Sequence, residues 1–489
     1  MLQPDICQRA VHARDARFDG VFFVGITTTR VYCRPVCPAR VSYPDRRRFF
    51  DSAASAERAG YRPCLRCRPE LAPGRALMDA VPRLARLAAQ RIGAGALNGH
   101  TVAELAGELG VSERHLRRAL ERELGVSPAE LAQTHRLLLA KRLLAETSLP
   151  VTRIAFASGF QSLRRFNSVF RERYRLSPTA LRRVAPSTAA PAAGPAADFV
   201  TLTLAYRKPF DWELLTVLLG RGAMPGVIMV EGGRYGRTVK LDGRSGVVLA
   251  ENSGTRSHLN VAVSLSLLPV LMPLLARLRR LFDLDAEPAV VDAHLAQNGL
   301  ASLVERRPGI RLPGALDGFE VALRSLILGL DGPGEAAPDL LDRVACSFGE
   351  EIQTGIPALC RLAPSPERVA AAGTAALESV GVPRRAAAAI VGVARALASG
   401  AIKLEPGRDI AAMHRALMEM EGVGERLATL IVMHALYWPD AFPASDPALQ
   451  RVAEASSRGA LRVRAECWRP WRAYAAQHLW LRDEEQRRA

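Results

Sequence analysis

Four cysteines near the N-terminus have a spacing that could bind a metal ion. Cys33 and Cys37 form a CxxxC pair, Cys64 and Cys67 form a CxxC pair, and 26 residues separate the two pairs. Each short spacing lets a turn aim two sulfur atoms at one point, and two such turns complete the tetrahedron that Zn²⁺ prefers. Spacing alone favours a zinc ion that only staples a small module together. The remaining cysteines are isolated and are expected to be buried or incidental: Cys7, Cys346, Cys360 and Cys467.

A second group of residues with the right types for DNA chemistry lies near the C-terminus. The segment Gly422-Val423-Gly424 is typical of a helix-hairpin-helix turn, whose glycines let backbone N–H groups approach a DNA phosphate closely. Asp446 follows 22 residues after Gly424 and precedes an expected helix. Its carboxylate could be catalytic, or it could only cap that helix. Asp440 is a rival carboxylate in an expected turn.

The charge distribution indicates a polyanionic partner for the front of the chain. Residues 1–185 hold 32 basic and 16 acidic residues, a net charge of +16, whereas the remainder holds 34 and 33. Most of the cations are arginines, whose planar fork suits phosphate and guanine edges. We therefore expect a polyanion to be bound mainly by the first 185 residues, and the motifs and resemblances below identify it as double-stranded DNA.

The composition predicts folded domains and no membrane span. Hydrophobic residues make up 49% of the 489 residues and charged residues 24%, which excludes a disordered chain. The N-terminus has no apolar signal region, and the most apolar stretch, 259–278, is interrupted by prolines and polar residues. We expect a cytoplasmic, nucleoid-associated bacterial protein without a membrane partner.

Composition and periodicity divide the chain into segments that must position these groups. We predict a multidomain protein that is mainly α with α+β parts. A Pro/Ala-rich stretch without periodicity, APSTAAPAAGPAAD, marks the clearest boundary. The expected segments are a small zinc-bound α/β module at 1–75, a helical basic domain at 80–184, the linker at 185–198, an α+β subdomain at 199–285 and an all-α domain at 286–489.

The helical basic domain contains an internal repeat typical of two helix-turn-helix units. In the first repeat a helix over 101–109 is followed by a tight turn at Gly110 and by Ser112 as N-cap of the next helix. The pattern recurs from Val151 through Gly159. The second helix of such a unit enters the major groove, where arginine can bind guanine, although each arginine could instead grip a phosphate or face solvent. The candidate DNA-contacting residues are Arg114, His115, Arg117, Arg118, Arg164 and Arg165.

The residues around the four cysteines give the first module a clear resemblance. The segments 27–40 and 60–69 resemble the N-terminal domain of the Ada methylation-response family. The resemblance implies that Cys33 accepts a methyl group irreversibly from a methylphosphotriester in DNA, with Cys37, Cys64 and Cys67 as companion zinc ligands. Arg34, next to the acceptor, is predicted to contact DNA. A purely structural zinc ion is the alternative.

The internal repeat resembles the paired helix-turn-helix domain of AraC-type activators. The resemblance covers 80–183 and is carried by Gly159-Phe160, Phe166, Phe170 and Ser177-Pro178. It implies transcription activation and an interaction with RNA polymerase. Because two units in one chain can read two successive major grooves, we expect a monomer.

The half beyond the linker resembles the AlkA-type 3-methyladenine DNA glycosylases of the helix-hairpin-helix superfamily. The matching stretches are 206–212, 281–284, 309–314 and 468–480. The resemblance implies that Asp446 is the catalytic carboxylate and that Trp480 and Trp212 line a pocket for an extruded, positively charged N-alkylpurine. The alternative is a regulator whose glycosylase half is a non-catalytic DNA-binding scaffold.

Four departures from the related families refine the expected chemistry. Arg426 stands where bifunctional glycosylases carry a Schiff-base lysine, which implies base excision without strand cleavage. Leu430 replaces a pocket tyrosine, and Asp331 lies where relatives carry a glutamine and an apolar wedge. We therefore expect either weaker activity or a different base range. The Pro-Cys-His-Arg nucleophile motif of Ada proteins is absent, so we expect no repair of O6-alkylguanine.

Overall fold

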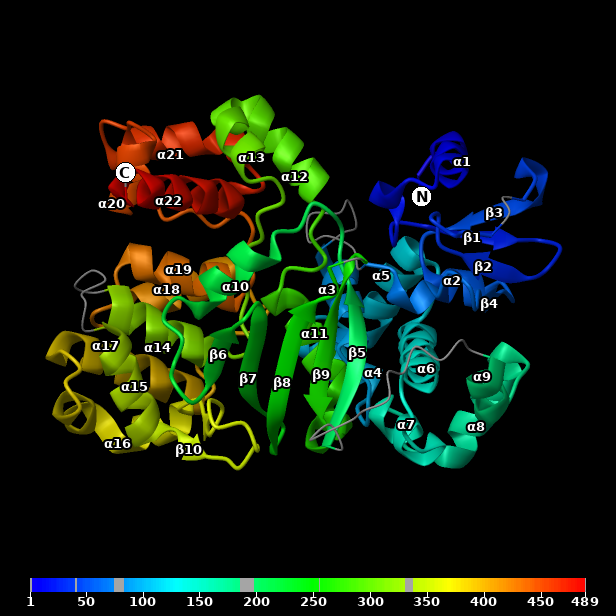
Figure 1. Cartoon of the computed structure of the whole chain (residues 1–489), viewed down its shortest axis with the longest axis horizontal. Helices are drawn as coiled ribbons and strands as arrows, with labels where there is room; N and C mark the ends of the chain where they lie inside the picture. Colours follow the sequence, from blue (N-terminus) through cyan, green and yellow to red (C-terminus); the bar gives the residue numbers. More distant parts are fainter. Residues whose placement is uncertain are drawn as a thin grey trace. The chain divides into compact units, whose positions relative to one another are not determined.

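A computed structural model describes residues 2–39, 42–73, 83–184, 198–254, 256–329 and 337–488 (Figure 1). The chain divides into two compact units, Met1–Arg207 with Thr255–Ala276, and Lys208–Gly254 with Arg277–Ala489. The predicted linker at 185–198 lies outside the described residues except for Asp198. Within the described ranges, every helix is too short or too polar to cross a lipid bilayer.

The metal module at the start of the first unit is built on a small mixed sheet. Its strands lie in the order β3-β1-β2-β4, with β1 antiparallel to both β2 and β3, and β2 parallel to β4. Ser52 and Ser55 form a capping box that starts the short helix α2 between β3 and β4. The elements are α1 Pro4–Ala13, β1 Phe23–Ile26, β2 Val31–Cys33, β3 Arg47–Phe50, α2 Ala53–Arg58 and β4 Arg62–Pro63.

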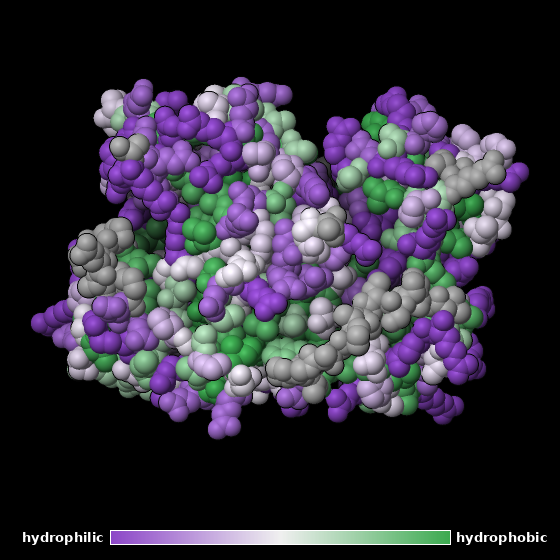
Figure 2. All heavy atoms as spheres, in the orientation of Figure 1, coloured by the Kyte–Doolittle hydropathy of each residue, from purple (hydrophilic) through white to green (hydrophobic). Residues whose placement is uncertain are grey.

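The predicted helix-turn-helix repeat is present in the same unit. Ser112 and Ser162 each accept a backbone hydrogen bond as N-cap of the second helix of a repeat. Gly110 and Gly159 hold the tight turns at φ +70° and +88°. On the face drawn in Figure 2, hydrophilic side chains gather over α8 and α9. The helices are α3 Arg83–Gly93, α4 Val102–Glu108, α5 Glu113–Leu124, α6 Pro128–Glu146, α7 Val151–Ala157, α8 Leu163–Tyr174 and α9 Pro178–Val184.

The two second helices of the repeat are anchored by apolar residues spaced four apart. This spacing places them on one helical face, which packs into the core and leaves the opposite face to solvent. In α5 these residues are Leu116, Leu120 and Leu124, and in α8 they are Phe166, Phe170 and Tyr174.

The first unit also contains an antiparallel pair of strands from beyond the linker. β5 Phe199–Ala205 pairs with β9 His258–Ser264 along its whole length. Glu146 at the end of α6 accepts a hydrogen bond from the Thr203 hydroxyl of β5 at 2.7 Å and one from the Thr203 N–H at 3.1 Å. Burial alternates along both strands, because successive side chains of a strand point to opposite faces of the sheet.

The second unit combines an antiparallel meander with a bundle of helices. β6 Ile228–Glu231, β7 Arg234–Leu241 and β8 Arg244–Asn252 pair in sequence order. A short pair, β10 Glu350–Glu351 and β11 Arg361–Leu362, joins two helices. The helices are α10 Trp212–Gly220, α11 Leu271–Leu281 from Arg277 onward, α12 Pro288–Leu295, α13 Ala301–Arg306, α14 Gly318–Gly329, α15 Ala337–Phe348, α16 Pro366–Ser379, α17 Arg384–Ala398, α18 Ile410–Met418, α19 Glu425–Ala435, α20 Pro447–Val452, α21 Arg458–Ala465 and α22 Arg472–Arg488. The predicted class, multidomain and mainly α with α+β parts, is confirmed.

Candidate functional site

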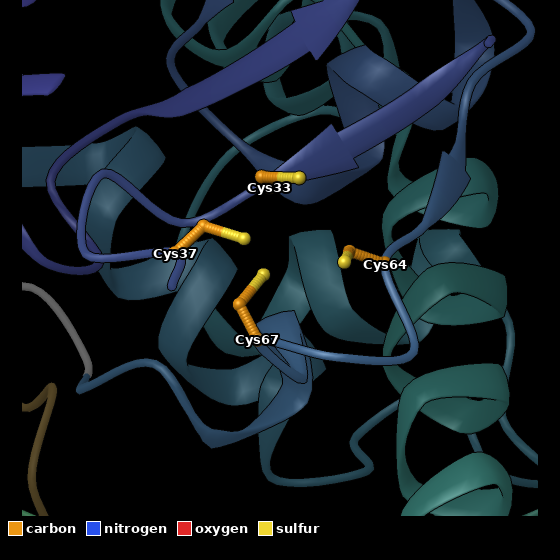
Figure 3. A group of neighbouring side chains, drawn as sticks. All are labelled: Cys33, Cys37, Cys64 and Cys67. Atoms are coloured by element: carbon orange, nitrogen blue, oxygen red, sulfur yellow. The ribbon is translucent and has the colours of Figure 1, made fainter. Parts of the chain in front are cut away.

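The four predicted ligands converge on one point in the metal module (Figure 3). Cys33 is the last residue of β2, and Cys64 directly follows β4. Cys37 closes a tight turn, in which its N–H donates to the carbonyl of Arg34. All four sulfur atoms lie within 4.8 Å of one another. A tetrahedral zinc ion with Zn–S bonds of about 2.3 Å requires sulfur atoms about 3.8 Å apart. The donor set and its geometry therefore fit zinc.

A cation at the centre would also change the protonation of the four cysteines. Hydrogen bonds with Cys37, Cys64 and Cys67, together with burial, raise the pKa of the Cys33 thiol far above its usual value. Hydrogen bonding with Cys33 lowers the pKa of Cys37 to about 7. The sulfurs thus share protons when no charge balances them. A divalent cation at the centre would favour four thiolates instead.

Backbone N–H groups distinguish the ligands from one another. The N–H of Arg34 donates to Cys67 Sγ, and the N–H of Arg66 donates to Cys64 Sγ, both at 3.4 Å. Among the described residues, no backbone N–H donates to Cys33 Sγ. A hydrogen bond to a thiolate stabilises its charge and weakens it as a nucleophile. This difference leaves Cys33 as the more reactive of these three sulfurs.

The side chain of Arg34 is used inside the module. Its Nε donates to Asp19 at 2.7 Å, a second nitrogen pairs with the same carboxylate, and Nη1 donates to the carbonyl of Cys67 at 3.2 Å. Only 16% of the Arg34 side chain is exposed. Arg34 therefore fixes the Cys67 loop, and a contact between its guanidinium and DNA would require the loss of these bonds.

The six candidate residues of the helix-turn-helix domain are all exposed. They project from the faces of α5 and α8 that the apolar anchors leave to solvent. Arg117 pairs with Glu113 one turn earlier at 2.8 Å, an exposed pair that DNA could displace at little cost. Their contacts with DNA stay a prediction. The residues are Arg114, His115, Arg117, Arg118, Arg164 and Arg165.

Asp446 caps a helix and keeps one oxygen for other contacts. Its Oδ1 accepts the N–H groups of Ala448 at 3.0 Å and Leu449 at 3.3 Å at the start of α20. Its Oδ2 lies 3.6 Å from Nη1 of Arg426, and the side chain is 10% exposed. The capping role and a catalytic role are thus compatible, because they use different oxygens. The sequence did not reveal the contact with Arg426, since the two residues lie on separate helices.

The rival carboxylate, Asp440, is fully engaged in ion pairs. Arg472 donates to it from Nε at 2.7 Å, and Arg469 pairs with it from the other side. Both arginines flank the start of α22, so Asp440 ties the preceding loop to that helix. This arrangement favours Asp446 over Asp440 as the carboxylate available for chemistry.

The predicted hairpin joins α18 to α19. Gly422 adopts φ +79°, and a Cβ there would lie 3.0 Å from the Ala389 methyl carbon. Gly424 is the N-cap of α19 at φ −81°, and no described heavy atom lies within 4 Å of its Cβ position. The first N–H groups of α19 have no partner within the helix and form a site suited to a phosphate.

The predicted base-pocket tryptophans lie in different surroundings. Trp212 is 5% exposed, its indole N–H donates to the Gly233 carbonyl at 2.7 Å, and its ring packs edge-on against Phe282. This burial assigns Trp212 to the core rather than to an accessible pocket wall. Trp480 is half-buried against the C-terminal helical core, and Leu430 is half-buried on α19. Asp331 lies outside the described residues.

A buried carboxylate that the sequence did not single out organises the same unit. Asp283 accepts hydrogen bonds from the hydroxyls of Tyr437 and, at 2.8 Å, Tyr474, and from the N–H of Leu312 at 3.0 Å. Burial raises the pKa of Asp283 to about 6. The only sequence signal was a lone aspartate between apolar residues in Leu281-Phe282-Asp283-Leu284.

Comparisons with known proteins agree with the three resemblances. Residues 6–70 match the metal binding domain of Ada, residues 105–184 a helix-turn-helix domain, and residues 201–317 the AlkA N-terminal domain. The predicted zinc cofactor is thereby confirmed, while the role of each ligand stays a prediction.

Three relatives cover different parts of the chain. A probable bifunctional transcriptional activator/DNA repair enzyme AlkA of Mycobacterium tuberculosis is 37% identical over 97% of this chain and 95% of its own length. DNA-3-methyladenine glycosylase 2 of Escherichia coli is 32% identical over 58% of this chain and 97% of its own. The bifunctional transcriptional activator/DNA repair enzyme Ada of Escherichia coli is 32% identical over 30% of this chain and 40% of its own. The chain belongs to the family of fused proteins that join an Ada-type metal-binding domain and a helix-turn-helix domain to an AlkA-type DNA glycosylase.

Proposed function

We propose that this protein senses alkylated DNA, activates transcription in response and excises damaged purines. Its relatives are named as transcriptional activators, DNA repair enzymes and 3-methyladenine glycosylases. The observation that carries the enzymatic part is the second oxygen of Asp446, Oδ2, which the helix cap does not use and which faces Arg426. The proposal includes the domain boundaries predicted from the sequence, 1–75, 80–184, 199–285 and 286–489.

The sensing step transfers one methyl group to Cys33. Its sulfur attacks the methyl carbon of a DNA methylphosphotriester, so that a C–S bond forms and a C–O bond breaks. The electron pair stays on the phosphate oxygen, which becomes an ordinary phosphodiester anion. Bound zinc supplies the thiolate state of the four sulfurs. Cys33 is proposed as the acceptor on the family resemblance. Backbone N–H bonds to Cys64 and Cys67, and one from Ala39 to Cys37, support this choice, because they stabilise the charge of the other three sulfurs.

Methylation changes the charge of the cluster close to the DNA backbone. Four thiolates and one Zn²⁺ carry −2, and conversion of one thiolate to a thioether leaves −1. At roughly 10 Å, removing one unit of repulsion is worth about 0.4 to 1.7 kcal/mol per phosphate, for dielectric constants between 80 and 20. Several phosphates would make the gain in affinity tenfold or more. We propose that this gain favours promoter binding by the two helix-turn-helix units of a monomer and contact with RNA polymerase.

The excision step is hydrolysis of the N-glycosidic bond. Asp446 stabilises the positive charge that develops on the sugar, or orients the attacking water. Arg426 stays protonated and is a poor amine nucleophile, so no Schiff base forms and the DNA strand is not cut. Trp480 is proposed to contact the extruded base.

The glycosylase proposal is tested with a duplex that contains one N-methylpurine. The wild-type chain should release the base and leave an abasic site, and Asp446→Asn should lose at least about a hundredfold in rate because asparagine carries no charge. Asp409 is a matched control, because it caps α18 through Oδ1 to two N–H groups in the same way. Asp409→Asn should retain the activity. A second duplex carries hypoxanthine, a neutral damaged purine, and no abasic product from the wild type on either duplex would favour the non-catalytic scaffold.

The sensing proposal is tested on the full chain by mass spectrometry. Incubation with DNA that carries methylphosphotriesters should add the mass of one methylene unit, on the peptide that contains Cys33. Cys33→Ser should gain no mass. An unchanged wild-type mass would indicate a zinc ion with a structural role only.

A further inference from the structure

Arg426 places a permanent positive charge beside the carboxylate proposed to act on the sugar. Its Nη1 lies 3.6 Å from Asp446 Oδ2, and its Nη2 donates to the carbonyl of Gly329, the last residue of α14. The two acceptors hold the planar guanidinium on two sides. The side chain is still 31% exposed, so part of the cation faces solvent next to Asp446.

We propose that Arg426 shifts the substrate preference of the glycosylase toward damaged purines that carry no positive charge. This inference rests on the proposed excision of bases at Asp446. For the carboxylate to stabilise the sugar, C1′ must lie close to Oδ2, and the base is bonded to C1′. The base therefore leaves from within about 8 Å of the guanidinium. At that distance the guanidinium alone disfavours a like charge by roughly thirtyfold at an effective dielectric constant of 20, less with solvent screening. The Asp446 carboxylate attracts the same charge, so the effect of Arg426 is measured as a change in preference between variants that all keep Asp446.

The movement of the electron pair during base release also distinguishes neutral bases from cationic ones. When a neutral purine leaves, the C1′–N bond breaks, its electron pair moves to the base nitrogen, and negative charge builds up on the base. Water adds its oxygen to C1′, and its proton ends on the departing base. Arg426 keeps its own protons and stabilises that charge with N–H groups. A cationic N-alkylpurine leaves as a neutral base, so the guanidinium gives it no comparable help.

Two residues of the expected base pocket lack an accessible aromatic face for a cationic base. A cation binds well against aromatic faces, but Trp212 is buried with its N–H already bonded. Leu430 lies one turn after Arg426 on the same face of α19 and is aliphatic. Arg426 and Leu430 thus put a guanidinium and an aliphatic side chain on one face of α19, and neither of them favours a cation, whereas Asp446 and Trp480 act in the other direction.

The test compares two substrates within each variant of the full chain. One duplex carries N7-methylguanine, which is cationic, and the other carries hypoxanthine, which is neutral. Single-turnover rates of base release give a ratio of cationic to neutral excision. This ratio does not depend on how much of a preparation is folded. Arg426→Gln should raise the ratio by about tenfold, because the charge is lost while the hydrogen-bonding capacity is partly kept.

Two further variants make the outcome decisive. Arg426→Met removes the charge together with the N–H groups and should raise the ratio at least as far as Arg426→Gln. Arg395, exposed on α17, is the control for a change of net charge, and Arg395→Gln should keep the ratio of the wild type. The inference is wrong if Arg426→Gln or Arg426→Met leaves the ratio unchanged, or if Arg395→Gln shifts it as far as they do. If the wild type releases neither base, the glycosylase proposal itself fails and the inference falls with it.

Discussion

Glu57 and Arg173 form an ion pair 3.4 Å long inside the first unit, although Glu57 lies in the metal module and Arg173 on α8. Glu57 is buried and also accepts hydrogen bonds from the hydroxyls of Tyr32 at 3.1 Å and Thr134 at 2.9 Å. Tyr32 directly precedes Cys33 on β2. One buried carboxylate therefore connects the strand of the proposed methyl acceptor with a helix that is predicted to read DNA.

The first prediction concerns the pH dependence that this burial imposes. Desolvation raises the pKa of Glu57 from 4.5 to about 7, despite the opposing effect of Arg173. Between these values the folded chain binds more protons than the unfolded chain, so the contribution of Glu57 to stability falls as the pH rises through this window. Glu57→Gln should remove that part of the slope. Thermal unfolding of the full chain at several pH values measures it.

The exposed residue Glu172 provides the control for this measurement. Glu172→Gln should leave the slope as in the wild type. Equal slopes in the wild type and Glu57→Gln would show that Glu57 is charged throughout the window, and the prediction would then be wrong.

The second prediction concerns removal of the metal. Without a cation the four sulfurs, which lie within 4.8 Å of one another, must share protons or repel one another. Chelation of zinc should therefore lower the free energy of unfolding of the metal module by several kcal/mol. Zinc content and thermal unfolding are measured together before and after chelation. Cys346, exposed on α15, gives the control, since Cys346→Ser should change neither quantity. A chain that holds no zinc as purified would contradict the prediction.

The third prediction concerns the recognition helix α8. Arg164 and Arg165 are exposed at its start, next to the N-cap Ser162. If they bind phosphates, replacing each by glutamine should weaken binding to a mixed-sequence duplex and reduce the slope of log affinity against log salt by about 0.9. Arg122, exposed at the end of α5, is the control. A salt slope that does not change in either variant would rule out the phosphate contact.

The features that the sequence predicted well are those that depend on local spacing. The CxxxC and CxxC turns need only their own residues to aim four sulfurs, and the structure brings these sulfurs together. Ser112 caps a helix because a short hydroxyl side chain reaches the N–H three residues ahead. The apolar spacing of α5 and α8 is likewise a property of each helix alone.

The features that the sequence could not supply depend on partners far along the chain. From the sequence Arg34 was expected to contact DNA, whereas in the structure its Nε donates to the carboxylate of Asp19. Trp212 matched a motif, but the position of its ring depends on Phe282 and on the Gly233 carbonyl. The contact between Arg426 and Asp446 depends on how α19 packs beside α20, which neither segment encodes by itself.

The last prediction separates the roles of the two hairpin glycines. Gly422 adopts φ +79°, and a Cβ there would meet the Ala389 methyl carbon at 3.0 Å and the Arg385 carbonyl oxygen at 3.1 Å. Gly422→Ala should therefore destabilise the second unit by about 1 to 3 kcal/mol. Gly424 adopts φ −81°, and no described heavy atom lies within 4 Å of its Cβ position. Gly424→Ala should leave the thermal stability unchanged or slightly higher.

DNA binding should respond to Gly424→Ala even though stability does not. The added methyl group would stand in front of the first N–H groups of α19, where a phosphate is expected to approach. Affinity for duplex DNA should fall while the unfolding temperature stays the same, a combination that a merely structural glycine would not produce. Wild-type affinity in Gly424→Ala would mean that the hairpin holds no phosphate, and the glycosylase domain would then have to grip DNA through other elements.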